Sequence, residues 1–230
     1  MASVPRALAV ACALALPACQ SPPGNPHDPS VLLRERLVAW QEVRAQGWTC
    51  EERAAESSPL VDCERISGEI ALLAVEFPRH PDVLLANASI AHALKRPDQA
   101  QGYLDRLLGI QPMRPDAALL RSRIALVDGN LRLARRVLEE QIELVPDHAG
   151  LREALASVFY LEGETEAAQR SLDAAARLGA PRWRVAYNRG LIAEAEAELD
   201  EAARHYEEAL RGAPEFHRAR SRLRGLGVGR

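Results

Sequence analysis

Aromatic residues are scarce in this chain of 230 residues: phenylalanine, tryptophan and tyrosine together make up 4% of it. β-branched residues are sparse as well, so the hydrophobic 47% of the sequence consists mainly of alanine and leucine. These two residues are among the strongest helix formers, whereas sheets are rich in β-branched and aromatic side chains. The composition therefore predicts an all-α protein.

The sequence also lacks an excess of charge of either sign. It has 29 Lys and Arg against 32 Asp and Glu, for a net charge of -3. Binding to DNA or RNA requires a strongly basic face, so no nucleic-acid partner is expected. An apolar run of about 20 residues, as a transmembrane helix requires, is missing too. The run from Ala7 to Leu16 is too short.

The N-terminus has the features of a secretory signal. Arg6 precedes the apolar run, and such a signal has a basic head followed by about 7–15 apolar residues. Leu16 is too large for the third-last position of an ordinary cleavage site. Leu16-Pro17-Ala18-Cys19 instead resembles the lipobox of bacterial lipoproteins. The resemblance implies that residues 1–18 are removed and that Cys19 becomes an acylated N-terminus. The alternative is a plain secretory signal that contains a cysteine.

Residues 19–29 are interpreted as a tether between the acylated cysteine and the folded body. Four prolines in this segment disfavour helix and favour extended polyproline conformation, with a reach of roughly 30 Å. Gln20 follows the cysteine. By analogy with lipoprotein sorting in enteric bacteria, this residue indicates the outer membrane, with the protein facing the periplasm.

Four cysteines are present, and only two of them are expected to matter for folding. Cys12 leaves with the signal and Cys19 is acylated, so Cys50 and Cys63 remain. In an oxidising compartment such a pair usually forms a disulfide. Metal binding is the rival interpretation, but no CxxC or HxxxH motif accompanies the pair. No metal and no cofactor are expected.

A repeat with a period of 34 residues runs through the chain from residue 81 to residue 216. Segments that begin at Pro81, Pro115, Ala149 and Trp183 align without gaps. Position 8 is always small: Ala88, Ser122, Ala156 and Gly190. Position 20 is always alanine: Ala100, Ala134, Ala168 and Ala202. Position 24 is a larger side chain: Leu104, Leu138, Leu172 and Tyr206.

This pattern resembles the tetratricopeptide repeat, in which each 34-residue unit is a hairpin of two antiparallel helices. The resemblance implies a right-handed α-solenoid of four such repeats. Small side chains at positions 8 and 20 let the two helices of a unit approach closely. Gly129 and Gly163 fall in the turn between them, where positive φ is useful. Pro97 is expected to begin a second helix.

A divergent hairpin and a single helix are expected at the two ends of the solenoid. Residues 30–80 are interpreted as an N-terminal cap, with helices over residues 30–46 and 62–77 and the disulfide in the loop between them. Residues 217–230 are interpreted as a C-terminal capping helix with a frayed tail. The expected apolar face of the first helix consists of Val31, Leu32, Leu37, Val38 and Val43.

The resemblance also implies where a partner would bind, because the first helix of each repeat lines the concave face. The candidate partner-binding residues are His92, Leu119, Arg123, Glu153, Tyr160, Arg184, Tyr187 and Asn188. Further positions on this face are Leu85, Ser89, Leu126, Ser157, Leu191 and Glu194. Leu126 and Leu191 have the alternative of packing against a neighbouring helix. A carboxylate clamp is not expected, since only Asn188 matches the residues that such a clamp requires.

The sequence contains no catalytic motif. Its 6 histidines are scattered, without the spacing of a metal site, and it has neither G-x-S-x-G nor a Gly-rich phosphate loop. The expected function is a membrane-anchored adaptor of the bacterial cell envelope that binds a protein or peptide. By fold-level analogy, such lipoproteins serve pilus, secretin or outer-membrane protein assembly. The alternatives are a non-catalytic activator of a cell-wall enzyme and, remotely, an enzyme.

Overall fold

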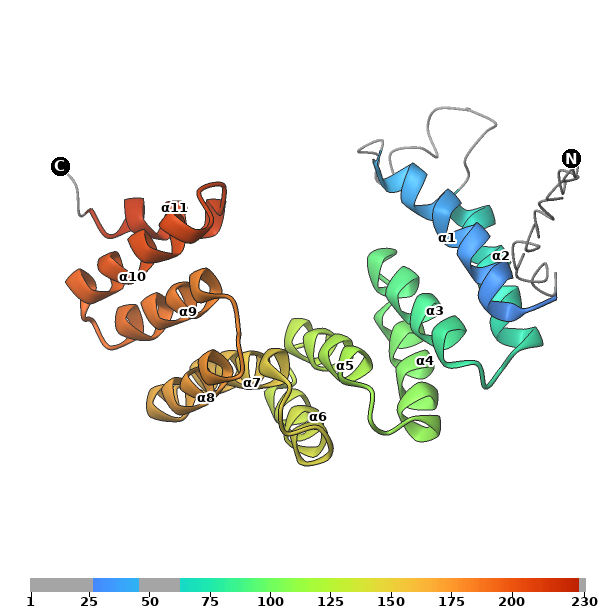
Figure 1. Ribbon diagram of the computed structural model, residues 1–230, viewed down its shortest axis with the longest axis horizontal. Coiled ribbons are helices and arrows are strands. Elements are labelled where there is room, and N and C mark those ends of the chain that lie inside the picture. Colours follow the sequence, from blue (N-terminus) through green and yellow to red (C-terminus); the bar gives the residue numbers. More distant parts are fainter. Residues whose placement is uncertain (1–26, 46–62, 228–230) are drawn as a thin grey trace, which may run out of the picture.

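The computed structural model describes residues 27–45 and 63–227. Within these ranges the chain forms eleven helices and no strand. Figure 1 shows the helices following one another along a curved arc, with α1 and α2 at one end and α10 and α11 at the other. The prediction of an all-α solenoid of stacked helical hairpins is confirmed. The helices are α1 (Pro29–Ala45), α2 (Cys63–Glu76), α3 (Pro81–Ala93), α4 (Pro97–Ile110), α5 (Pro115–Val127), α6 (Leu131–Leu144), α7 (Ala149–Glu162), α8 (Thr165–Arg177), α9 (Arg182–Ala195), α10 (Leu199–Gly212) and α11 (His217–Gly225).

The repeated positions form the core of the solenoid. Each side chain at position 20, all alanine, is 0% exposed, and so is each side chain at position 24. Alanine leaves room for the second helix to lie close to the first. The larger residue one turn later fills the space between neighbouring hairpins. One hairpin cannot bury this apolar surface by itself, so each hairpin depends on the next for its stability.

The turns within the hairpins use left-handed backbone in all four repeats. Gly129 has φ 72° and Gly163 has φ 78°, as the sequence predicts. The first and fourth repeats place other residues there: Lys95 with φ 56° and Ala197 with φ 61°. A side chain in this region strains the backbone, because its Cβ approaches the following carbonyl oxygen. Pro97 begins α4, where its missing N–H costs no helical hydrogen bond.

The expected apolar face of α1 is wrong in part. Leu32 and Leu37 are partly buried against the N-terminal core, as expected. Among the α1 side chains that the structure describes, the buried ones are Leu33 and Trp40, whereas Val38 is 49% exposed. Leu33, Leu37 and Trp40 follow the i, i+4, i+7 spacing of one helical face. The large indole of Trp40 belongs to the buried cluster that α1 forms with α2 and α3, and Val38 lies outside this cluster. The side chain of Val43 lies outside the described part.

The arc has an inner face made of the first helices of the hairpins. Besides the contacts within and between neighbouring hairpins, α1 contacts α3, α3 contacts α5, α5 contacts α7, and α7 contacts α9. The described part shows no comparable contact between the second helices of successive hairpins. First helices are therefore closer together than second helices, and the stack bends toward them.

Candidate functional site

The inner face carries a groove of about 670 Å³ built from the first helices of three hairpins and the start of α11. Its walls come from α5, α7 and α9, which the 34-residue spacing brings side by side. The lining residues are Leu119, Ser122, Arg123, Leu126, His148, Gly150, Glu153, Ala154, Ser157, Trp183, Arg184, Tyr187, Asn188, Phe216 and Arg218. Six of the eight candidate partner-binding residues lie in this one groove.

A polar network in the groove joins the third hairpin to the fourth. Glu153 is 8% exposed, and one oxygen of its carboxylate accepts a hydrogen bond from Nε of Arg184 at 2.8 Å, while the other oxygen lies 2.8 Å from Nη2 of the same guanidinium in an ion pair. Asn188 donates to the same carboxylate at 3.4 Å. A two-point guanidinium–carboxylate pair fixes both the distance and the orientation of the two helices. Glu153 and Arg184 thus hold α7 against α9 and neutralise each other.

An aromatic cluster closes the C-terminal end of the groove. The ring of Tyr187 lies 4.8 Å from that of Phe216 and 5.8 Å from that of Tyr206, while Trp183 lies 5.1 Å from Phe216. Edge-on and tilted contacts at these distances are favourable for aromatic rings. Tyr187 therefore has a packing role between α9, α10 and α11, in addition to its exposed edge in the groove.

The groove contains cationic side chains that are not neutralised within the described part of the chain. Arg123 and Arg218 are exposed, and neither makes an ion pair there. Of the described residues that line the groove, Glu153 alone is acidic, and Arg184 already pairs with it. The ring of His148 caps α7 by accepting from the backbone N–H of Leu151 at 3.2 Å. The surplus charge of the groove is therefore positive.

Two candidate residues lie outside the main groove. Tyr160 lines a smaller cavity of about 180 Å³ that shares Ser157 and Asn188 with the groove, so it extends the same surface. His92 lies near the end of α3 and lines none of the cavities described for the chain. A role of His92 in partner binding stays a prediction.

Leu126 and Leu191 combine both roles that the sequence left open. Leu126 lines the groove and packs on the central core, and Leu191 lines the smaller cavity and packs on the C-terminal core. Both side chains are partly buried. They therefore form the apolar floor of the site and are also part of the helix packing.

Seven residues that line the groove were not among the candidates: Ser122, His148, Gly150, Ala154, Trp183, Phe216 and Arg218. One more step of the repeat would have found Arg218, because 218 is 34 residues after 184 and therefore repeats the same groove-lining position. The capping helix α11 thus continues the first-helix register for one more unit. Trp183 and Phe216 stand just before this position in their respective units, where the chain enters a first helix.

The cysteine assignments lie mostly outside the described residues. This holds for the acylation of Cys19 and for Cys50. Cys63 is the first residue of α2 and is buried in the N-terminal core, 4% exposed. Its pairing with Cys50 stays a prediction. Within the described ranges, no group of three or more His, Cys, Asp or Glu residues could hold a metal ion. In the same ranges, no helix combines the length and the apolarity needed to cross a bilayer.

Comparison with known proteins identifies the fold. No family model matches the chain, and no curated protein matches it either. Solved structures do match. A thermophilic TPR protein from Thermus thermophilus has a TM-score of 0.66 at 20% identity, over 88% of this chain and 100% of its own. The fold is the tetratricopeptide-repeat solenoid.

Two further solenoids show the same likeness. A tetratricopeptide repeat protein from Parabacteroides merdae has a TM-score of 0.60 at 18% identity, over 86% of this chain and 78% of its own. A fragment of MamA from Desulfovibrio magneticus has a TM-score of 0.60 at 16% identity, over 82% of this chain and 97% of its own. At these identities the likeness is one of fold. Solenoids of stacked repeats present extended concave binding surfaces, which agrees with the position of the groove.

Proposed function

We propose that this protein is an adaptor of the bacterial cell envelope that holds a segment of a partner protein in the groove lined by α5, α7, α9 and α11. The observation that carries the proposal is the combination of an apolar, aromatic floor with two exposed arginines on one continuous concave surface. Aromatic and arginine side chains are the usual anchors of protein interfaces. The proposal assigns no chemistry to the chain.

The charge of the groove defines the kind of segment that fits it. Arg123 and Arg218 attract acidic side chains, and Leu119, Leu126 and Phe216 provide apolar contacts beside them. A helix or extended peptide with acidic residues next to large apolar ones matches this arrangement. The signal and lipobox at residues 1–19 supply the remaining part of the proposal. Two or more acyl chains on Cys19 would anchor the protein stably to a membrane.

A crosslinking experiment tests the groove. A photo-crosslinking residue in place of Ser157, at the centre of the surface, is expected to trap the partner in cells, and mass spectrometry identifies the crosslinked segment. We expect that segment to contain acidic residues. Combining the crosslinker with Arg123→Glu and Arg218→Glu should lower the crosslinked yield by about tenfold or more.

The matched control places the same charge change elsewhere. Arg132 and Arg136 of α6 are exposed and line none of the cavities described for the chain. Arg132→Glu together with Arg136→Glu should leave the yield unchanged, with helicity measured for both double variants. Equal loss of crosslinking in the two double variants would mean that net charge, and not the groove, governs capture.

A further inference from the structure

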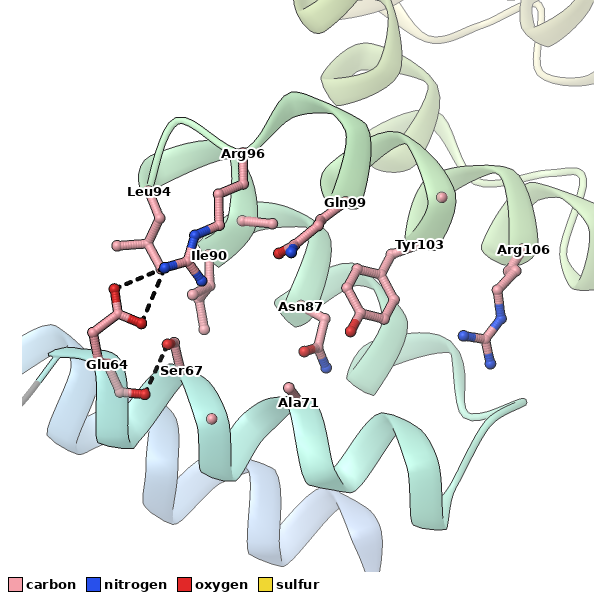
Figure 2. Close-up of a pocket in the computed structure, with 13 residues that line it drawn as sticks. Glu64, Ser67, Ala71, Asn87, Ile90, Leu94, Arg96, Gln99, Tyr103 and Arg106 are labelled. Atoms are coloured by element: carbon pink, nitrogen blue, oxygen red, sulfur yellow. Dashed lines mark hydrogen bonds and ion pairs between the residues drawn. The ribbon is translucent and has the colours of Figure 1, made fainter.

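A second pocket, of about 550 Å³, lies between second helices near the N-terminal end of the solenoid. Its walls come from α2 and α4, and its floor comes from α3 (Figure 2). The concave groove, in contrast, is lined by first helices of later hairpins. The volume falls within the range of roughly 300–1,000 Å³ that is typical of ligand sites. The two sites have no lining residue in common.

Asn87 presents a fixed hydrogen-bond acceptor in this pocket. The residue is 4% exposed, and its amide nitrogen donates to the carbonyl oxygens of Ile70 at 3.0 Å and Val83 at 2.9 Å. Both partners are acceptors, so the amide nitrogen must face them and the side-chain oxygen must face away. Within the described part of the chain, no donor reaches that oxygen. Figure 2 shows the oxygen on the side of Ser67 and the amide nitrogen on the side of Tyr103.

The side chain of Asn87 is buried as a whole, but its amide oxygen is not one of the enclosed side-chain atoms that lack a partner, so the oxygen is accessible from the cavity. Here the side chain is held in place by two bonds that use both of its N–H groups. What remains is an acceptor with a set direction at the edge of a cavity. Such a group is suited to an N–H from a bound molecule.

The charges of the pocket are arranged unequally along its length. At one end, Arg96 donates to both carboxylate oxygens of Glu64, at 2.7 Å and 3.0 Å, so the two charges cancel. At the other end, Arg106 donates to the backbone carbonyl of Pro78 at 2.7 Å and makes no ion pair in the described ranges. In Figure 2 the labelled side chains run from this ion pair, past Asn87 and Tyr103, to Arg106. The pocket therefore has a neutral end and a cationic end.

Two helical glycines widen the pocket. Gly68 of α2 and Gly102 of α4 line it, and a Cβ added to either would meet nothing within 4 Å. Neither glycine has positive φ. Glycine inside a helix is less stable than alanine, and neither backbone geometry nor close packing requires it at these two positions. Its effect is to leave space between α2 and α4.

We propose that this pocket binds a short extended peptide segment. A backbone N–H of the segment donates to Asn87, an apolar side chain lies against Ile90, Leu94 and Tyr103, and an acidic group pairs with Arg106. An extended peptide supplies N–H donors and side chains in alternation along its length, which matches the order of acceptor, apolar wall and cation. The site is independent of the concave groove and of its partner.

The test uses three defined probes: the dipeptides acetyl-Leu-Glu-amide, acetyl-Leu-Gln-amide and acetyl-Leu-Lys-amide. Each is titrated into the ¹⁵N-labelled protein, and amide chemical shifts are followed by NMR. We expect saturable shifts at Ser67, Asn87 and Gly102 with the acidic probe, and about tenfold weaker binding of the neutral probe. Equal binding of the three probes, absence of saturable shifts, or shifts confined to the concave groove would overturn the proposal.

Substitutions locate the site. Gly102→Leu places a side chain in the pocket and should abolish the shifts at Asn87. Gly109→Leu is the matched control: Gly109 belongs to the same helix, a Cβ there also meets nothing within 4 Å, and it does not line the pocket. Gly109→Leu should bind the acidic probe normally, and Arg106→Gln should reduce its affinity to that of the neutral probe. Unchanged binding in Gly102→Leu would refute the site.

Discussion

Gly190 of α9 lies directly against the phenol ring of Tyr206 in α10: a Cβ added to Gly190 would stand 2.5 Å from Cε1 of the ring. The other three repeats have alanine or serine at the first of these positions and leucine at the second. The fourth repeat thus combines the smallest residue with the largest. The total volume at the helix contact is conserved, although each residue differs from its counterparts.

This relationship predicts that Gly190→Ala destabilises the protein by about 1–3 kcal/mol, through overpacking against the ring. Adding Tyr206→Leu should recover much of the loss, because the double variant has the alanine–leucine pair found at Ala88 and Leu104 of the first repeat. Urea denaturation of the four proteins of this double-mutant cycle measures the coupling. If the effects of the two substitutions on the free energy of unfolding were additive, the predicted coupling between Gly190 and Tyr206 would be wrong.

The left-handed turn at Ala197 predicts a stabilising substitution. Ala197→Gly removes the clash of a Cβ at φ 61° and should raise the free energy of unfolding by about 0.5–1 kcal/mol. The reverse change at the equivalent turn, Gly163→Ala at φ 78°, should lower it by about 1–2 kcal/mol. Thermal unfolding of both variants checks the two signs. A loss of stability in Ala197→Gly would show that the turn is not strained.

Removing Arg184 from its ion pair with Glu153 should lower the free energy of unfolding more than removing the charge of Glu153. Arg184→Met leaves a buried carboxylate without its guanidinium and should cost about 1–3 kcal/mol. Glu153→Gln leaves Arg184, whose side chain is 44% exposed and is solvated by water, and should cost about 1 kcal/mol or less. Chemical denaturation at neutral pH compares the two. Equal costs would indicate that burial of Glu153 contributes little.

The buried hydroxyl of Tyr206 leads us to expect that the folded protein loses stability at alkaline pH. Burial, reinforced by the hydrogen bond to Glu194 at 2.6 Å and by the charge of that residue, raises the pKa of the Tyr206 hydroxyl far above its ordinary value. The unfolded chain loses this proton near pH 10 while the folded chain keeps it. The stabilisation is therefore complete below about pH 10 and declines as the pH rises further, by up to about 1.4 kcal/mol per pH unit.

Tyr206→Phe tests this sign. The variant should be less stable than the native protein at pH 8, by about 1 kcal/mol for the lost hydrogen bond, and the difference should shrink as the pH rises from 10 to 12. The chain contains a single lysine, Lys95, so few other groups titrate in this range. A constant difference between the two proteins across the range would contradict the raised pKa.

The proposed anchor predicts that Cys19→Ser releases the protein from the membrane. Mass spectrometry of the native protein should find an acylated cysteine as the first residue, because the proposed lipobox would direct cleavage before Cys19. The substituted protein should be soluble after cell fractionation. Recovery of the native protein with an unmodified N-terminus would show a plain secretory signal.

The repeat made the architecture predictable from the sequence. The four alanines at position 20 and the four larger residues at position 24 recur every 34 residues and are all buried. They therefore mark the face of each second helix that packs against other helices. The resemblance to the tetratricopeptide repeat implied that Leu119, Arg123 and Asn188 share one surface, and the three line one groove. The face of α1 could not be predicted in this way, because it has no second copy to define its register. Leu33 and Trp40 were recognised only in contact with α2 and α3.

Local sequence alone thus determined that this chain forms helices, where most of the hairpins turn, and that the hairpins stack, because propensity and periodicity are properties of short segments. Tertiary structure decided what the side chains of the stack do. In the folded chain Glu153 pairs with Arg184, and Tyr187 packs against Tyr206 and Phe216. The amide of Asn87 is oriented so that its oxygen faces a pocket. These outcomes depend on distances between helices that lie one or two hairpins apart, and no spacing along the chain encodes them.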